Sequence, residues 1–94
     1  MKPRYKKITA ARHKIYGDPK VSHEAIGYAW RAILQNSFQG IIIPPISADL
    51  VALLFAAYKL VRAARPPYHQ DSFDDAQIYI EFAEHFKSGK EVKV

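Results

Sequence analysis

The stretch SADLVALLFAAYKLVRAARPPYHQDSFDDAQIYIEFAEHF, residues 47–86, decides the fold that this sequence predicts. Its first half is almost entirely apolar. Ser47 is a good N-cap, because its side chain can accept a hydrogen bond from the first free N–H groups of a helix. That helix is expected to continue to about Ala64. Pro66 and Pro67 then end it, since proline has no N–H and clashes with the preceding turn.

A second helix is expected after these prolines, from about Asp71 to about Lys87. Ser72 followed by Asp75 resembles a capping box, with aspartate in place of the usual glutamate or glutamine. Gly89 stands near the C′ position at which many helices end, because glycine adopts a left-handed conformation without strain. The two segments therefore predict a helical hairpin at the centre of the protein.

Charges of both signs fall near the hinge of this hairpin. Lys59 and Arg62 lie three residues apart on one helical face, and Asp71, Asp75 and Tyr79 follow at a spacing of four on the next helix. Antiparallel packing would bring these two faces together. The pattern indicates either a partly buried ion-pair network that holds the hairpin or a site in which Lys59 or Arg62 binds phosphate.

Two shorter helices are expected before the hairpin. Residues 6–16 place apolar side chains at helical spacing, and the sequence YGDP at residues 16–19 ends that helix. Ser22 is a suitable N-cap for the next helix. This helix is expected to reach about Gln35 and to carry an apolar stripe that includes Trp30.

The remaining segments are expected to be irregular. Residues 41–46 (IIIPPI) contain two prolines, so they are expected to form an extended loop whose isoleucines cover the core or contact another subunit. Residues 1–5 are expected to be a solvated basic tail and residues 90–94 a frayed end. The predicted fold class is all-α, a single helical domain over residues 1–94 formed by a small bundle of about four helices.

The composition narrows the class of protein. The chain of 94 residues has no cysteine, which excludes a disulfide framework and zinc sites built on thiolates. No apolar run reaches the ~18 residues of a membrane span, and we expect a soluble, intracellular protein that does not bind membranes. A core this small also predicts self-association into a homo-oligomer.

Positive charge is concentrated near the N-terminus. The net charge is +5, and residues 1–20 contain seven lysines and arginines against one acidic residue, Asp18. Such a surface attracts phosphate groups. The apolar helix that follows Ser47 is unsuited to the major groove of DNA. The predicted partner is therefore a small phosphorylated nucleotide rather than a nucleic-acid duplex.

Several short motifs together resemble a known family. They are Arg12, the YGDP of residues 16–19, His23, Trp30, Asp49, Val51-Ala52, Lys59, Arg62, His69, Asp71, Asp75 and Tyr79. This set is similar to the pattern (H/Y)GDP…W…DVA…KxxR…DxxxDxxxY of small tailed-phage proteins of unassigned function. The resemblance implies a phage origin and a place in the cytoplasm of the bacterial host. Ile78 and Phe73 depart from the pattern, because members usually have glycine and often tryptophan there.

The first functional hypothesis is a non-enzymatic protein that sequesters a host immune nucleotide, of the cyclic oligonucleotide or cyclic ADP-ribose type, and so counters anti-phage defence. Cationic side chains would neutralise phosphate, an aromatic ring would stack on a base, and the YGDP turn would offer backbone N–H groups. No catalytic set, metal-ligand spacing or phosphate loop is found, so no catalytic residue, metal or cofactor is predicted. The predicted ligand-binding residues are Arg12, Lys14, Tyr16, Gly17, Asp18, His23, Lys59 and Arg62.

Two other hypotheses remain open at this stage. A MazG-like metal-dependent nucleotide pyrophosphohydrolase would require Asp18, Asp49, Asp71 and Asp75 to gather at one end of the bundle. A protein-binding inhibitor of a host factor would use the exposed isoleucine loop as its contact. Phosphate release with magnesium would identify the hydrolase, and co-purification of a host protein would identify the inhibitor.

Overall fold

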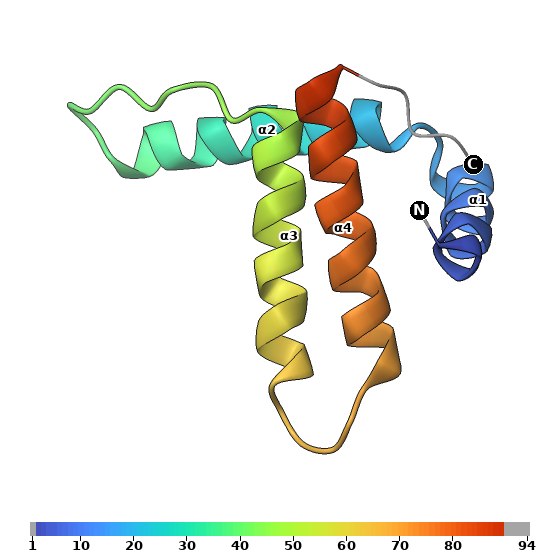
Figure 1. The fold of residues 1–94 in the computed structure, drawn as a ribbon. Coiled ribbons are helices and arrows are strands. Elements are labelled where there is room, and N and C mark those ends of the chain that lie inside the picture. Colours follow the sequence, from blue (N-terminus) through green and yellow to red (C-terminus); the bar gives the residue numbers. More distant parts are fainter. Residues whose placement is uncertain (1, 90–94) are drawn as a thin grey trace.

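The computed structural model describes residues 2–89, and within that range it contains four α-helices and no strand. The helices are α1 (Pro3–Tyr16), α2 (Pro19–Ser37), α3 (Ala48–Ala63) and α4 (Gln70–Ser88). α3 and α4 lie side by side as an antiparallel hairpin, and α2 crosses them near the end opposite the hairpin turn (Figure 1). The predicted all-α helical bundle is therefore confirmed. Residues 90–94, which are expected to fray, lie outside the described residues.

The core lies between α3 and α4, where small side chains allow the helices to approach closely. Val51 and Ala52 on α3 and Ile78 on α4 are all 0% exposed. Tyr5 of α1 and Phe82 of α4 form one cluster with Ala52 and Ile78, so the first helix contributes to the core of the hairpin. This arrangement brings the turn between α1 and α2 close to the hairpin, which is where the candidate site forms.

The caps predicted for the hairpin helices involve Ser47, Ser72 and Gly89, and the structure confirms two of the three. Ser47 caps α3, and its side chain accepts a hydrogen bond from the Leu50 N–H at 3.4 Å. Gly89 ends α4 in the left-handed conformation, with φ of 75°. The capping box predicted for α4 is wrong, because His69 holds the N-cap position and Ser72 is buried in the first turn. The serine side chain faces the interior there rather than the free N–H groups.

The basic tail expected over residues 1–5 is also wrong, because α1 already covers most of that segment. Tyr5 is 1% exposed, and Arg4 forms an ion pair with Asp74 of α4. Tyr5 and Thr9 stand one turn apart and are both buried, so one face of this strongly cationic helix docks on the hairpin. Because lysines surround these two residues in the sequence, the buried face of the helix is not evident from the sequence alone.

α2 begins earlier than expected, with Asp18 rather than Ser22 as its N-cap. Gly17 precedes it at φ 81°, and this left-handed backbone turns the chain between α1 and α2. The Asp18 side chain accepts a hydrogen bond from the Lys20 N–H at 2.9 Å. Pro19 occupies the first helical position, where its missing N–H leaves no hydrogen bond unmade.

Residues 41–46 form the predicted extended loop and fold back along α2. The side-chain amide of Gln35 hydrogen-bonds the loop backbone twice, at 2.6 Å and 2.8 Å. The loop backbone packs directly against Gly27 of α2, where a Cβ would lie 2.2 Å from the carbonyl oxygen of Ile46. Only glycine fits this crossing, although nothing in the sequence marks it.

Candidate functional site

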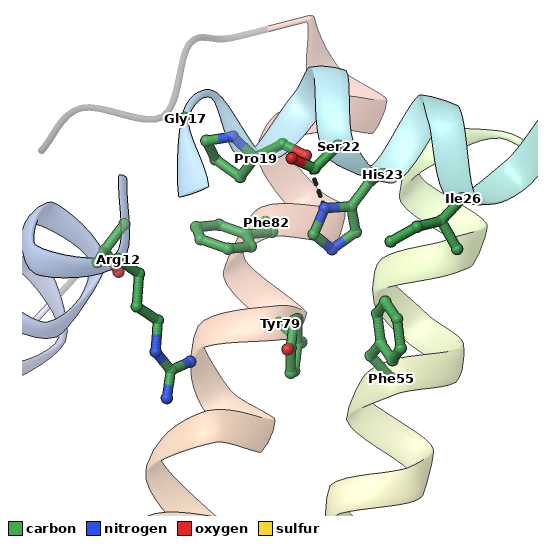
Figure 2. Close-up of a pocket in the computed structure, with 10 residues that line it drawn as sticks. Arg12, Gly17, Pro19, Ser22, His23, Ile26, Phe55, Tyr79 and Phe82 are labelled. Atoms are coloured by element: carbon green, nitrogen blue, oxygen red, sulfur yellow. Dashed lines mark hydrogen bonds between the residues drawn. The ribbon is translucent and has the colours of Figure 1, made fainter. Parts of the chain in front are cut away.

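A cavity of about 210 Å³ lies where the turn between α1 and α2 faces the α3–α4 hairpin. Figure 2 shows that side chains from all four helices border it. Its apolar walls are Ile26, Phe55, Tyr79 and Phe82, and its polar side chains are Thr9, Arg12, Ser22 and His23. An apolar pocket with a few convergent polar groups has the usual composition of a small-molecule site.

His23 reaches into this pocket from α2 (Figure 2). Its Nδ1 lies 2.6 Å from the carbonyl oxygen of Pro19, one turn earlier in the helix. A carbonyl oxygen can only accept a hydrogen bond, so Nδ1 carries the proton of the neutral ring. The other nitrogen, Nε2, is buried and has no hydrogen-bond partner in the described part of the chain. Nε2 is therefore a free acceptor.

Four aromatic rings surround this imidazole, which is only 6% exposed. Their centroids lie 5.4–6.0 Å from that of His23, and the rings belong to Phe55, Tyr79, Phe82 and Phe86. Burial among them lowers the pKa of His23 below its ordinary value, against a smaller opposite effect of the hydrogen bond to Pro19. The ring is therefore neutral near pH 7, and Nε2 keeps its lone pair.

An ion triad, formed by Arg12, Asp75 and Lys59, borders the pocket. Asp75 accepts a hydrogen bond from Arg12 Nη2 at 2.7 Å, and its other oxygen lies 3.1 Å from Lys59 Nζ. The carboxylate is largely buried, whereas the Arg12 side chain is 42% exposed. The contact between Lys59 and Asp75 confirms the link predicted across the hairpin. Two cations against one carboxylate leave a net positive charge at the edge of the pocket.

The structure brings together four of the residues that the sequence assigns to a ligand. Arg12, Gly17 and His23 line the pocket, and Lys59 reaches Asp75 beside it. Gly17 contributes the backbone of the turn. The sequence pattern predicted these residues without indicating that a single carboxylate on α4 would join Arg12 to Lys59.

The other predicted ligand residues are placed differently. Arg62 is exposed and lies over the ring of Tyr58, 5.9 Å from its centroid. Lys14 is exposed on α1. The carboxylate of Asp18 caps α2, so it occupies the helix start at which a phosphate is expected from the sequence. The side chain of Tyr16 lies outside the described part of the structure.

The aspartates of the hydrolase hypothesis do not gather at one end. Asp49 stands in the first turn of α3 and Asp71 in the first turn of α4, and the antiparallel hairpin holds these turns at opposite ends (Figure 1). Asp18 caps α2, and Asp75 is paired with two cations. Within residues 2–89, no group of three or more His, Asp or Glu side chains is placed to hold a metal ion. The described residues therefore lack the gathering of aspartates that this alternative requires.

The enclosure of His23 is the part of the site that the sequence did not reveal. Tyr79, Phe82 and Phe86 follow one another at helical spacing on α4, and this stripe is visible in the sequence. Such a stripe ordinarily packs in a core. What distinguishes this stripe from an ordinary core stripe is its contact with His23. That contact arises only because α2 crosses the hairpin.

A protein-family profile described as "Domain of unknown function (DUF6378)" matches residues 2–87, nearly the whole chain, so the protein belongs to that family. This finding confirms the resemblance to an uncharacterised family, and the attribution to phages stays a prediction. No curated protein and no solved structure shows significant similarity to the chain. None of the described helices combines the length and the apolar character that crossing a bilayer requires.

Proposed function

We propose that the protein is a non-enzymatic binding protein for a small phosphorylated nucleotide, and that the pocket around His23 receives the base. The observation that carries the proposal is the unpaired Nε2 of His23, buried among aromatic rings. A buried polar atom without a partner destabilises a folded protein by about 1–3 kcal/mol. A ligand that donates a hydrogen bond to this nitrogen would remove that penalty, once a shift of the neighbouring rings opens the nitrogen to the pocket.

The pocket favours a planar group that carries an N–H donor. Adenine, cytosine and guanine all have an exocyclic amino group. The rings of Phe55 and Tyr79 lie 5.2 Å apart between centroids, and together with Phe82 they line the wall beside His23. Stacking of a base on an aromatic side chain contributes about 1–3 kcal/mol to binding. A nucleobase therefore matches both the apolar walls and the acceptor on His23.

Arg12 is placed to bind the phosphate of such a ligand. Its guanidinium carries several N–H donors in a planar fork, and Nη2 donates to Asp75. The exposed part of the side chain faces solvent, and Lys59 offsets the charge of the carboxylate. Arginine commonly binds phosphate through two parallel hydrogen bonds. The aspartate thus holds Arg12 in position while leaving the edge of the pocket positive.

The size of the cavity limits the ligand. Its volume of about 210 Å³ lies below the roughly 300 Å³ of pockets that enclose drug-sized molecules. One base would fit inside, with the sugar and phosphate extending past Arg12. A cyclic oligonucleotide would then insert one base and leave the others outside or in the pocket of a second copy.

The sequence resemblance supports a finer form of the proposal. The protein would be phage-encoded, would act in the cytoplasm of the bacterial host, and would hold an immune signalling nucleotide intact. Sequestration requires binding without turnover. After long incubation with magnesium, the bound nucleotide should therefore be recovered unchanged, and conversion to a monophosphate would identify a hydrolase instead.

Isothermal titration calorimetry with mononucleotides, cyclic dinucleotides, cyclic trinucleotides and cyclic ADP-ribose tests the site directly. His23→Phe keeps an aromatic ring and removes the acceptor. Binding should weaken about tenfold to thirtyfold, which corresponds to the loss of one hydrogen bond. The melting temperature should change little, because the variant removes the unpaired Nε2 and also the hydrogen bond between Nδ1 and Pro19.

Arg12→Ala should weaken binding as well, and Lys14→Ala is its matched control, because that change removes an equal charge from the same helix outside the pocket. The control should bind like the wild type. The proposal fails if no nucleotide of the panel binds, or if His23→Phe binds as tightly as the wild type.

A further inference from the structure

The face of α3 that points away from α4 is apolar and exposed. Leu50, Leu53, Leu54, Leu60 and Val61 are between 42% and 61% exposed. In Figure 1, α4 lies along one side of α3, and no other described helix covers the opposite side. Monomeric soluble proteins rarely expose a large contiguous apolar patch. We call this surface the outer face of α3, and we expect another protein surface to cover it.

The outer face runs as a continuous column along the helix. Leu50, Leu54, Ala57 and Val61 follow at helical spacing and extend over about 16 Å. Lys59 is the single charged residue between the two ends of this column, and it is directed to Asp75 on the α4 side. The column is thus free of charge and presents only aliphatic side chains.

The whole chain exposes more surface than its mass requires. Its accessible surface is 6754 Å², whereas a compact monomer of 10.7 kDa exposes about 5,500 Å². Its radius of gyration is 14.5 Å, against about 12 Å for a compact chain of this length. The excess area of roughly 1,200 Å² belongs to the open arrangement of the whole chain, and the exposed apolar side chains of the outer face contribute to it.

We infer that the outer face of α3 is a homodimer interface, in which α3 of a second copy packs on it about a twofold axis. Permanent homodimer interfaces are more apolar than other contacts and have few charges at their centre, as this column has. A twofold arrangement places the same patch on both sides, so one apolar column suffices. The inference is independent of the nucleotide pocket, which lies on the side of the hairpin that faces α1.

Analytical ultracentrifugation over a concentration series tests the dimer. The wild type should sediment as a dimer, and Leu54→Glu should weaken association by about a hundredfold or more, because it places an unpaired charge at the centre of the interface. Its circular dichroism should match the wild type, since Leu54 is 47% exposed in the single chain. Ile42→Glu is the matched control, at a loop residue that is 86% exposed.

Cysteine cross-linking locates the contact, because the chain has no cysteine of its own. Leu54→Cys and Ala57→Cys, made separately, stand near the middle of the column. Oxidation should link one of them into a disulfide dimer, which requires Cα atoms within about 7 Å.

Three results would overturn the inference: a wild-type monomer at concentrations up to about 100 µM, a Leu54→Glu protein that remains dimeric, or the absence of cross-links at both positions. Dissociation by Ile42→Glu would assign the contact to the isoleucine loop instead.

Discussion

The contact between α3 and α4 and the contact between α1 and α4 combine apolar burial and ion pairs in different proportions. The first is predominantly apolar and closed to water, with Ile78 at 0% exposure. The second joins a cationic helix to the hairpin through the buried ring of Tyr5 and through two ion pairs, Arg4 with Asp74 and Arg12 with Asp75. The arginine side chains of these pairs remain 54% and 42% exposed.

The difference indicates how firmly each wall of the pocket is held. Apolar burial stabilises in proportion to the area removed from water and depends little on salt, whereas partly exposed ion pairs are screened. Phe55, Tyr79 and Phe82 come from the apolar contact, and Arg12 comes from the ion-paired helix. The base-binding wall should therefore respond little to salt, while the phosphate-binding arginine lies on the helix whose contacts salt weakens most.

The largest effect is expected from Ile78→Ala in the apolar contact. Removing a fully buried isoleucine side chain should lower the free energy of unfolding by about 3–4 kcal/mol. Ile80→Ala on the same helix is the matched control, because Ile80 is 45% exposed. It should lose under about 1 kcal/mol. Urea unfolding of both variants measures the difference, and equal losses would show that the hairpin core lies elsewhere.

A smaller loss is expected from Asp75→Ala at the ion triad. The change leaves Arg12 and Lys59 close together without their carboxylate, and because both cations are partly exposed we expect a loss of about 2 kcal/mol. Asp71→Ala, one turn earlier on the exposed side of α4, is the control and should lose under about 1 kcal/mol. If both substitutions have the same small effect by urea unfolding, the triad does not hold the helices together.

The pH dependence of stability should report on the apolar enclosure of His23. Burial lowers its pKa in the folded state, so below the unfolded value of about 6.5 the unfolded chain takes up a proton that the folded chain resists. This contribution to stability is present above that pH and is lost as the pH falls. Urea unfolding at about pH 7.5 and about pH 5.5 should show a larger drop for the wild type than for His23→Phe. Equal drops would contradict a depressed pKa.

The smallest effect is expected from salt, and it should be confined to α1. About 1 M sodium chloride shortens the screening length to about 3 Å and weakens the two arginine pairs. Hydrogen exchange of the α1 amides should then become faster, while that of α3 and α4 changes little. Faster exchange in all helices alike would indicate that α1 and the hairpin open as one unit.

Local chemistry in the sequence was enough to predict the hairpin. The apolar periodicity after Ser47, the stop at Pro66 and Pro67, and the glycine after α4 act within a few residues of the positions they determine. The link between Lys59 and Asp75 followed from the same periodicity, because two helices joined by a short turn must pack antiparallel. These features belong to neighbouring parts of the chain, which is why a single sequence suffices for them.

The remaining features depended on contacts between distant parts of the chain. In the sequence Tyr5 belongs to a basic tail, but in the structure it is buried against α4. Arg12 has the sequence context of a free cation, but in the structure it pairs with Asp75. His23 becomes a buried acceptor only where α2 crosses the hairpin, and the need for Gly27 arises from the return of the loop over α2. The sequence by itself determined which segments are helical, because helix formation follows local spacing. Only the tertiary structure decided which polar groups are buried, because burial depends on residues far away in the chain.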